Sequence, residues 1–305
     1  MTIKNITLGL LLGAMSMGLS SCLGDPENKS SFSVNVSNMI FPDNPAEEVS
    51  VDQNCTYNIA LDGVKNTITI GTSTLSLDGK NNVSFTTNEM KGLVASVSSM
   101  GYQSGSFANG QAHLSNGEEI TRLGGYFTTV VASYAVAGDP FPITTSVPML
   151  VMSYRTNNAL IRTFSTDAFF QGQTKTTYAF GGQEQSFVTD EAVYRVKFSS
   201  DMKKANVVLY NIRFASQMPR PLQAVVLKDV PVTLSRAGYT LEISDCIPEM
   251  LESGALTPYP SYTFDSFKLM SVSDDLTQIS CEYVVNGSFK GSFSGRSCAA
   301  FSAQQ

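Results

Sequence analysis

The sequence has 305 residues, a formal net charge of −6 at pH 7, and only 15% charged residues. A mildly acidic chain without a basic stretch has no electrostatic footprint for nucleic acid, so we exclude nucleic acid as a partner. The length is enough for one large β domain or two domains of ordinary size.

Residues 1–21 predict a signal peptide. Lys4 precedes an apolar run from Ile6 to Leu19, and a basic residue followed by an apolar run is typical of secretory leaders. The run is about 14 residues long, shorter than the roughly 20 that a helix needs to span a bilayer core. We therefore do not expect a permanent membrane helix here.

Cys22 follows Leu19, Ser20 and Ser21, and this segment resembles the bacterial lipobox. The resemblance implies that the Cys22 thiol is acylated and anchors the chain to a membrane, because each buried CH₂ contributes about 0.8 kcal/mol. Residues 22–31 would then be a flexible, lipidated tether. Its acidic residues resemble the surface-export signal of Bacteroidota lipoproteins. We expect an outer-membrane protein at the cell surface or, alternatively, facing the periplasm.

The chain contains an internal duplication. TYNIAL at 56–61 matches VYRVKF at 193–198, which places Tyr57 and Tyr194 at a spacing of 137 residues. Further pairs at this spacing are Phe32 with Phe169, Phe41 with Tyr178, Gly101 with Gly238, and Tyr102 with Tyr239. The alignment predicts two homologous β domains, at 32–166 and 168–298. Chance similarity between β-rich segments is the alternative.

A predicted hairpin closes each copy. MSYRTNNALIRTF at 152–164 matches CEYVVNGSFKGSF at 281–293, now at a spacing of 129. A loop at 286–288 places Val285 opposite Phe289 and Cys281 opposite Phe293. The same register in the first copy pairs Thr156 with Leu160 and Met152 with Phe164.

Short alternating runs separated by turn residues favour antiparallel β structure. In the second copy we expect strands at 169–180, 192–199, 205–215, 223–235, 238–244, 262–272, 277–285 and 289–295. The segment 246–258 interrupts this pattern, and Pro248 suits the first turn of a short helix. The predicted fold class is all-β, with two tandem antiparallel eight-stranded barrels or, alternatively, two sandwiches.

LKDVPVTLSRAGYTLEI at 227–243 and the closing YVVNGSFKGSF hairpin, together with the lipobox and tether, carry a family resemblance. They are similar to the calycin-like, lipocalin-related β-barrel lipoproteins of Bacteroides and its relatives. The resemblance implies two calycin-like barrels on a lipid anchor.

No catalytic residue, metal site or cofactor is predicted. His113 is the only histidine and lies in a polar stretch, so we interpret it as a solvated surface residue; a metal site or a Ser-His-Asp triad would depend on this one ring. Ser200 and Lys203 fit the Ser-x-x-Lys spacing of acyl-transfer enzymes but lie in a predicted turn. The chain is therefore predicted not to be an enzyme, and a hydrolase is the least favoured alternative.

Cys55, Cys246, Cys281 and Cys298 form an even set in an exported chain, so disulfides are possible. A bridge between Cys246 and Cys298 would link the 246–258 segment to the last strand. Buried free thiols are the alternative.

Pro-flanked aromatic residues in loops predict the ligand-binding positions. Phe141 in DPFP, and Tyr259 and Tyr262 in TPYPSY, are candidates to stack on a ligand, with packing against the barrel as the alternative. The leading hypothesis is a non-catalytic lipoprotein that binds a small apolar or glycan ligand or an envelope protein. The alternative is a structural or adhesive component of a surface assembly. An interior cavity lined by Tyr and Phe would favour the first, and a filled core the second.

Overall fold

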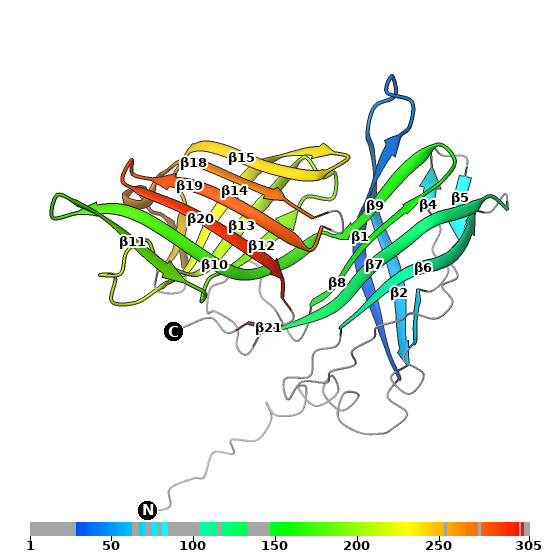
Figure 1. The fold of residues 1–305 in the computed structure, drawn as a ribbon, viewed down its shortest axis with the longest axis horizontal. Coiled ribbons are helices and arrows are strands. Elements are labelled where there is room, and N and C mark those ends of the chain that lie inside the picture. The colour runs from blue at the N-terminus through cyan, green and yellow to red at the C-terminus, as the bar shows by residue number, and fades with distance from the viewer. Residues whose placement is uncertain are drawn as a thin grey trace, which may run out of the picture.

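The computed structural model describes residues 29–62, 67–70, 75–77, 81–84, 104–114, 117–132, 147–252, 255–273, 276–298 and 300–301. These residues form two β sheets that follow one another in the chain (Figure 1). The predicted signal peptide, the proposed lipid-attachment residue Cys22 and the candidate Phe141 lie outside the described residues. No helix in the described part of the chain has the length and apolarity needed to cross a membrane.

The first sheet is antiparallel and follows an open path through the described residues. Its strands are β1 (Lys29–Pro42), β2 (Ser50–Asp62), β3 (Thr67–Ile70), β4 (Leu75–Leu77), β5 (Asn81–Ser84), β6 (Ser104–Leu114), β7 (Glu119–Ala132), β8 (Val147–Arg155) and β9 (Ala159–Ser165). Their order in space is β3-β2-β1-β9-β8-β7-β6-β5-β4. The short C-terminal strand β21 (Ala300–Phe301) returns to this sheet and pairs parallel to β7.

The second sheet closes into an antiparallel barrel. The eight barrel strands are β10 (Asp167–Phe180), β12 (Val193–Phe198), β13 (Lys204–Ile212), β14 (Leu222–Ser235), β15 (Gly238–Cys246), β18 (Phe264–Ser271), β19 (Gln278–Val285) and β20 (Phe289–Ser297). Pairing between β13 and β14 completes the ring. The predicted all-β class and one of the two predicted eight-stranded antiparallel barrels are confirmed, and closure leaves these eight strands without a free edge along the ring.

Three strands of the second sheet were not anticipated. They are β11 (Gln183–Thr189), β16 (Glu249–Glu252) and β17 (Ala255–Pro258). A short helix or a turn was predicted for 246–258. The helix is wrong, because β16 and β17 form a hairpin there. The cause is tertiary: β15 pairs with only the last residues of β14, so β16 takes the vacant edge and sets Met250 opposite Val225.

The two sheets share the order of their neighbours. Starting from β3 and β13, the orders β3-β2-β1-β9-β8-β7-β6-β5 and β13-β12-β10-β20-β19-β18-β15-β14 correspond strand by strand. Tyr57 and Tyr194 occupy equivalent places, opposite Val34 in the first sheet and opposite Phe170 in the second. This agreement supports the predicted duplication, although the domain boundaries at 32–166 and 168–298 stay predictions.

The predicted spacing of 137 residues between the two copies is nevertheless wrong by one residue at their first strands, β1 and β10. Val34 and Phe170 are equivalent through their tyrosine partners, and they lie 136 residues apart. A slip of one residue moves every side chain of a strand to the other face of the sheet. The pairs Phe32 with Phe169 and Phe41 with Tyr178 are therefore not structural equivalents.

The closing hairpins also differ by one residue. In the second sheet Val285 pairs with Phe289 and Cys281 pairs with Phe293, as predicted. In the first, Leu160 pairs with Arg155 instead of Thr156, and Phe164 pairs with Val151 instead of Met152. The predicted register of the first hairpin is wrong because the Thr156 N–H bonds to the Ala159 carbonyl at 3.0 Å, which shortens the loop to two residues.

Candidate functional site

Aromatic side chains fill the interior of the barrel. Tyr194 and Phe293 stack with ring centroids 3.8 Å apart and planes 5° apart. Phe214 meets Tyr283 edge to face at 6.0 Å and Phe264 at 6.2 Å. All five side chains are buried. The barrel therefore has a packed aromatic core in the place where a lipocalin-like cup would hold a ligand.

Four hydroxyl groups lie within this core. Tyr194, Tyr283, Thr174 and Thr176 are at most 2% exposed, and none of their hydroxyl oxygens has a hydrogen bond of good geometry. Burial raises the pKa of Tyr194 and of Tyr283, and each lies close enough to the other to affect its pKa. These tyrosines stay neutral at physiological pH and serve as core residues.

One end of the barrel packs against the first sheet, and we call it the proximal end. Phe164 on β9 contacts Phe198 at 5.2 Å and Tyr239 at 5.7 Å between ring centroids. A single cluster of buried apolar residues runs through both sheets at this contact. Apolar packing of this kind holds the sheets as one body.

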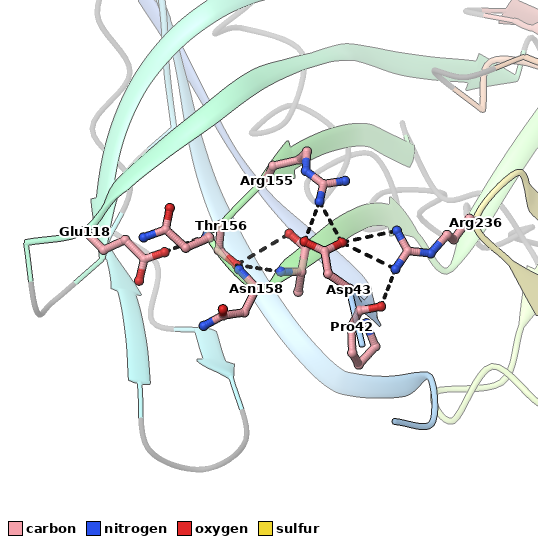
Figure 2. Close-up of polar contacts among 9 residues, drawn as sticks. Pro42, Asp43, Glu118, Arg155, Thr156, Asn158 and Arg236 are labelled. Carbon is pink, nitrogen blue, oxygen red and sulfur yellow. Dashed lines mark hydrogen bonds and ion pairs between the residues drawn. The ribbon is translucent and has the colours of Figure 1, made fainter. Parts of the chain in front are cut away.

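An ion cluster borders the same contact (Figure 2). Asp43, which follows β1, accepts hydrogen bonds from Arg155 at 2.6 Å and from Arg236 at 3.4 Å. Arg236 lies in the β14–β15 turn of the barrel and also donates to the Pro42 carbonyl. The hydrogen bond from Arg155 is the main cause that lowers the pKa of Asp43. This carboxylate therefore joins the two sheets at neutral pH.

A groove of about 410 Å³ lies beside the ion cluster, between the 41–49 segment and residues Ser235 and Arg236. Its polar groups bond mainly to each other: Asn44 donates to Glu47 and accepts from the Ala46 N–H. Since few donors or acceptors remain to bind a ligand, we interpret the groove as part of the contact between the two sheets.

The opposite, distal end of the barrel carries a chain of aromatic rings. In order these are Tyr178, Phe289, Phe214, Tyr262 and Tyr259, with successive centroids 5.8, 6.2, 5.2 and 5.6 Å apart. The last two rings are nearly parallel, with 19° between their planes. They come from the segment before and within the short 3-10 helix η1 (Pro260–Tyr262).

The outer part of this distal end is accessible. Tyr259 and Tyr262 are half-buried, and Pro258 and Pro260 beside them are exposed. Ile247 is 51% exposed and belongs to the same loop region, because the Tyr259 N–H bonds to the neighbouring Pro248 carbonyl. The distal end thus presents a rigid aromatic and proline surface of the kind that stacks on planar or apolar ligand faces.

The structure brings together Tyr259 and Tyr262, two of the three predicted ligand-binding residues. The sequence signal for these two residues is a proline beside an aromatic ring. This signal marks the loop that contains Tyr259 and Tyr262, but it does not mark the supporting rings Phe214 and Phe289. Phe214 follows the end of β13 and Phe289 begins β20, so both are far away in the sequence and reach the site only through barrel closure.

The predicted bridge between Cys246 and Cys298 is absent: both are free thiols, as are Cys55 and Cys281. Cys246 pairs with Phe264 at the distal end, whereas the Cys298 N–H bonds to the Phe169 carbonyl at the proximal end. A disulfide needs Cα atoms within about 7 Å, and the length of a barrel strand separates these two. The alternative of free thiols is the one observed.

The positions weighed for catalysis are exposed. His113 is exposed on β6, and Ser200 and Lys203 are exposed in the β12–β13 turn. Among the described residues there is no group of three or more His, Cys, Asp or Glu side chains suited to a metal ion.

No protein-family model matches the sequence, and no curated protein matches it. Among solved structures, the N-lobe domain of lactoferrin binding protein B from Moraxella bovis is similar at a TM-score of 0.29 and 13% identity, covering 87% of this chain and 99% of that one. Two mutants of the vaccine antigen transferrin binding protein B from Haemophilus parasuis are similar at TM-scores of 0.25 and 0.26, each 9% identical and covering 88% of this chain and 76% of the other. Superpositions this poor carry no functional argument.

Proposed function

We propose that this protein is a non-enzymatic lipoprotein, anchored through Cys22 in the outer membrane of a Gram-negative bacterium, that binds a partner through the distal end of its barrel. The partner is an envelope protein or a glycan. The wider resemblance to Bacteroidota lipoproteins fits this proposal.

One observation carries the choice of binding surface: the barrel is filled while its distal end is open to solvent. The stacked Tyr194 and Phe293 rings occupy the interior, so a small apolar ligand inside the barrel is disfavoured. Tyr259 and Tyr262 keep part of their surface accessible. Half-buried aromatic rings held by a rigid base are typical anchors for proteins and sugars.

The test replaces the accessible rings and leaves the core intact. Tyr259→Ala and Tyr262→Ala in the full chain are compared with wild type by cross-linking in cells, with mass spectrometry of the captured partners, and by binding to a glycan array. We expect each variant to lose most of the captured protein or glycan. Val272→Ala is the matched control, since Val272 is 54% exposed and follows β18 at the proximal end. Equal capture by all variants would overturn the proposal.

The anchor is tested separately. Mass spectrometry of the N-terminal peptide should find acyl chains on Cys22, and Cys22→Ala should move the protein from the membrane fraction to the soluble fraction or block its processing. An unmodified Cys22 in the mature protein would contradict the proposed location.

A structural or adhesive role is the second candidate. The filled barrel favours it, because a packed core with an exposed apolar surface suits an assembly component.

A further inference from the structure

The β10–β11 hairpin extends beyond the barrel at its distal end (Figure 1). Its turn is Gly181-Gly182, and both glycines have positive φ angles, 61° and 79°. Such a two-residue turn matches the twist of the flanking strands and fixes their register. Among the described residues β11 pairs with β10 alone, so one edge of β11 has no neighbouring strand.

The register shows which backbone groups face that free edge. Phe180 and Gln183 flank the turn and are paired. In a two-residue hairpin this pair is hydrogen-bonded, and hydrogen-bonded pairs then alternate along the ladder. The N–H and C=O groups of Glu184, Ser186 and Val188 therefore point away from β10. All three residues are exposed.

The edge has few of the usual features that prevent strand pairing, and Glu184 is its one charged residue. β11 contains no Pro and no Lys, and its pairing with β10 has no bulge. Its seven residues make it longer than a typical protected edge strand, and Val188 is 50% exposed. Edges of this kind are templates for a further strand.

β11 is complementary to a second copy of itself. Ser186 is the central residue of the strand and points its backbone groups to the free edge, so a two-fold axis can pass beside it. Antiparallel pairing about that axis sets Glu184 opposite Val188 of the second copy and uses the whole strand. It also avoids opposing the two Glu184 carboxylates, which a register centred on Glu184 would bring together.

The charges on the exposed face agree with the same register. Lys175 on β10 pairs with Val188, and Val188 would pair with Glu184 of the second copy. Lys175 and Glu184 of the second copy then lie on either side of Val188, on three neighbouring strands. Their side chains are long enough to meet above the valine.

We propose that two copies of this protein associate through their β11 edges, in antiparallel register about Ser186, to form a four-stranded β10–β11 sheet. This proposal does not rest on partner binding by Tyr259 and Tyr262. One strand on each side makes an interface smaller than the ~1,200 Å² of stable complexes, so the dimer is reversible.

The test is cysteine cross-linking of the full chain in isolated membranes, with a mild oxidant and non-reducing electrophoresis. In the proposed register the two Ser186 Cα atoms are about 5.5 Å apart, within the range for a disulfide. Ser186→Cys should give a covalent dimer. Glu184→Cys is the matched control, on the same exposed edge, because its two copies would lie about 14 Å apart. A mixture of Glu184→Cys and Val188→Cys chains should cross-link to each other.

Ser186→Pro provides the second measurement. It removes an N–H that β10 does not use, so the hairpin should remain folded while the edge is blocked. In sedimentation of the detergent-solubilised full chain, wild type should show a concentration-dependent dimer and Ser186→Pro a monomer. Equal cross-linking of Ser186→Cys and Glu184→Cys, no dimer with either, or capture of a different protein by Ser186→Cys would overturn the proposal.

Discussion

At the scale of the residue, the stability of the barrel depends on the small size of Gly291 and on the protonation of Cys298. Gly291 on β20 lies under the ring of Tyr283, where an added Cβ would come within 1.9 Å of the ring carbon Cζ. Cys298 is buried beside the start of β10. Each gives a prediction.

Gly291→Ala should destabilise the protein by about 3 kcal/mol, because the packed core has no space for the methyl group and the Tyr283 ring must move. Urea unfolding followed by circular dichroism measures the loss. Ser292→Ala, on the neighbouring exposed position of the same strand, should be nearly neutral. Similar losses for both would mean that strand propensity, and not the contact with Tyr283, sets the effect.

Stability should fall at alkaline pH partly through Cys298. Burial raises the pKa of its thiol to about 12, from an ordinary value of 9.0. Above pH 9 the unfolded chain loses this proton while the folded chain keeps it, so the free energy of unfolding decreases as pH rises from 9 to 12. Unfolding measured between pH 8 and 11 should decline less steeply for Cys298→Ala than for wild type; parallel curves would contradict the assignment.

At the scale of the element, strand β21 connects the end of the chain to the first sheet. Ala300 and Phe301 pair with Val131 and Ala132 of β7, directly after the last barrel strand. The C-terminal segment thus ties the two sheets together through backbone hydrogen bonds.

Ending the chain after Cys298 should expose the paired edge of β7 and leave the barrel intact. Hydrogen exchange should become faster at Val131 and Ala132, because their pairing with β21 is lost, while amides of the β19–β20 hairpin stay protected. Unchanged exchange at β7 would show that β21 is not paired in solution.

At the scale of the whole molecule, apolar packing and not the ion cluster should hold the two sheets together. Phe164 is 3% exposed and contacts two rings of the barrel. Arg236 and Asp43 are 48% and 37% exposed at their ion pair, and such pairs contribute little in water.

Phe164→Ala should therefore destabilise the protein by about 3–5 kcal/mol, the usual cost of deleting a buried phenylalanine. Arg236→Ala should leave stability almost unchanged. Calorimetry of both variants decides the matter, and it also shows whether the sheets of the Phe164→Ala variant unfold in separate transitions. A larger effect from Arg236→Ala would reverse the order of importance proposed here.

The sequence by itself determined the all-β class and the eight strands of the barrel in the second sheet. Alternation of apolar and polar residues is local, and it places Val285 opposite Phe289 as soon as the turn at Gly287 is recognised. The proximity of Tyr259 and Tyr262 was also within reach, because only Pro260 and Ser261 separate them in the chain.

Only the tertiary structure decided closure, register and the free edge. Whether β10 meets β20 depends on the first and last barrel strands in the chain, which are brought together only when the six strands between them are in place. The one-residue differences in register at Val34 and Leu160 come from backbone hydrogen bonds. An alignment of similar side chains contains no information about these bonds. A filled interior and an open edge on β11 are likewise properties of the assembled barrel, since local periodicity specifies which face of a strand is apolar but not what covers it.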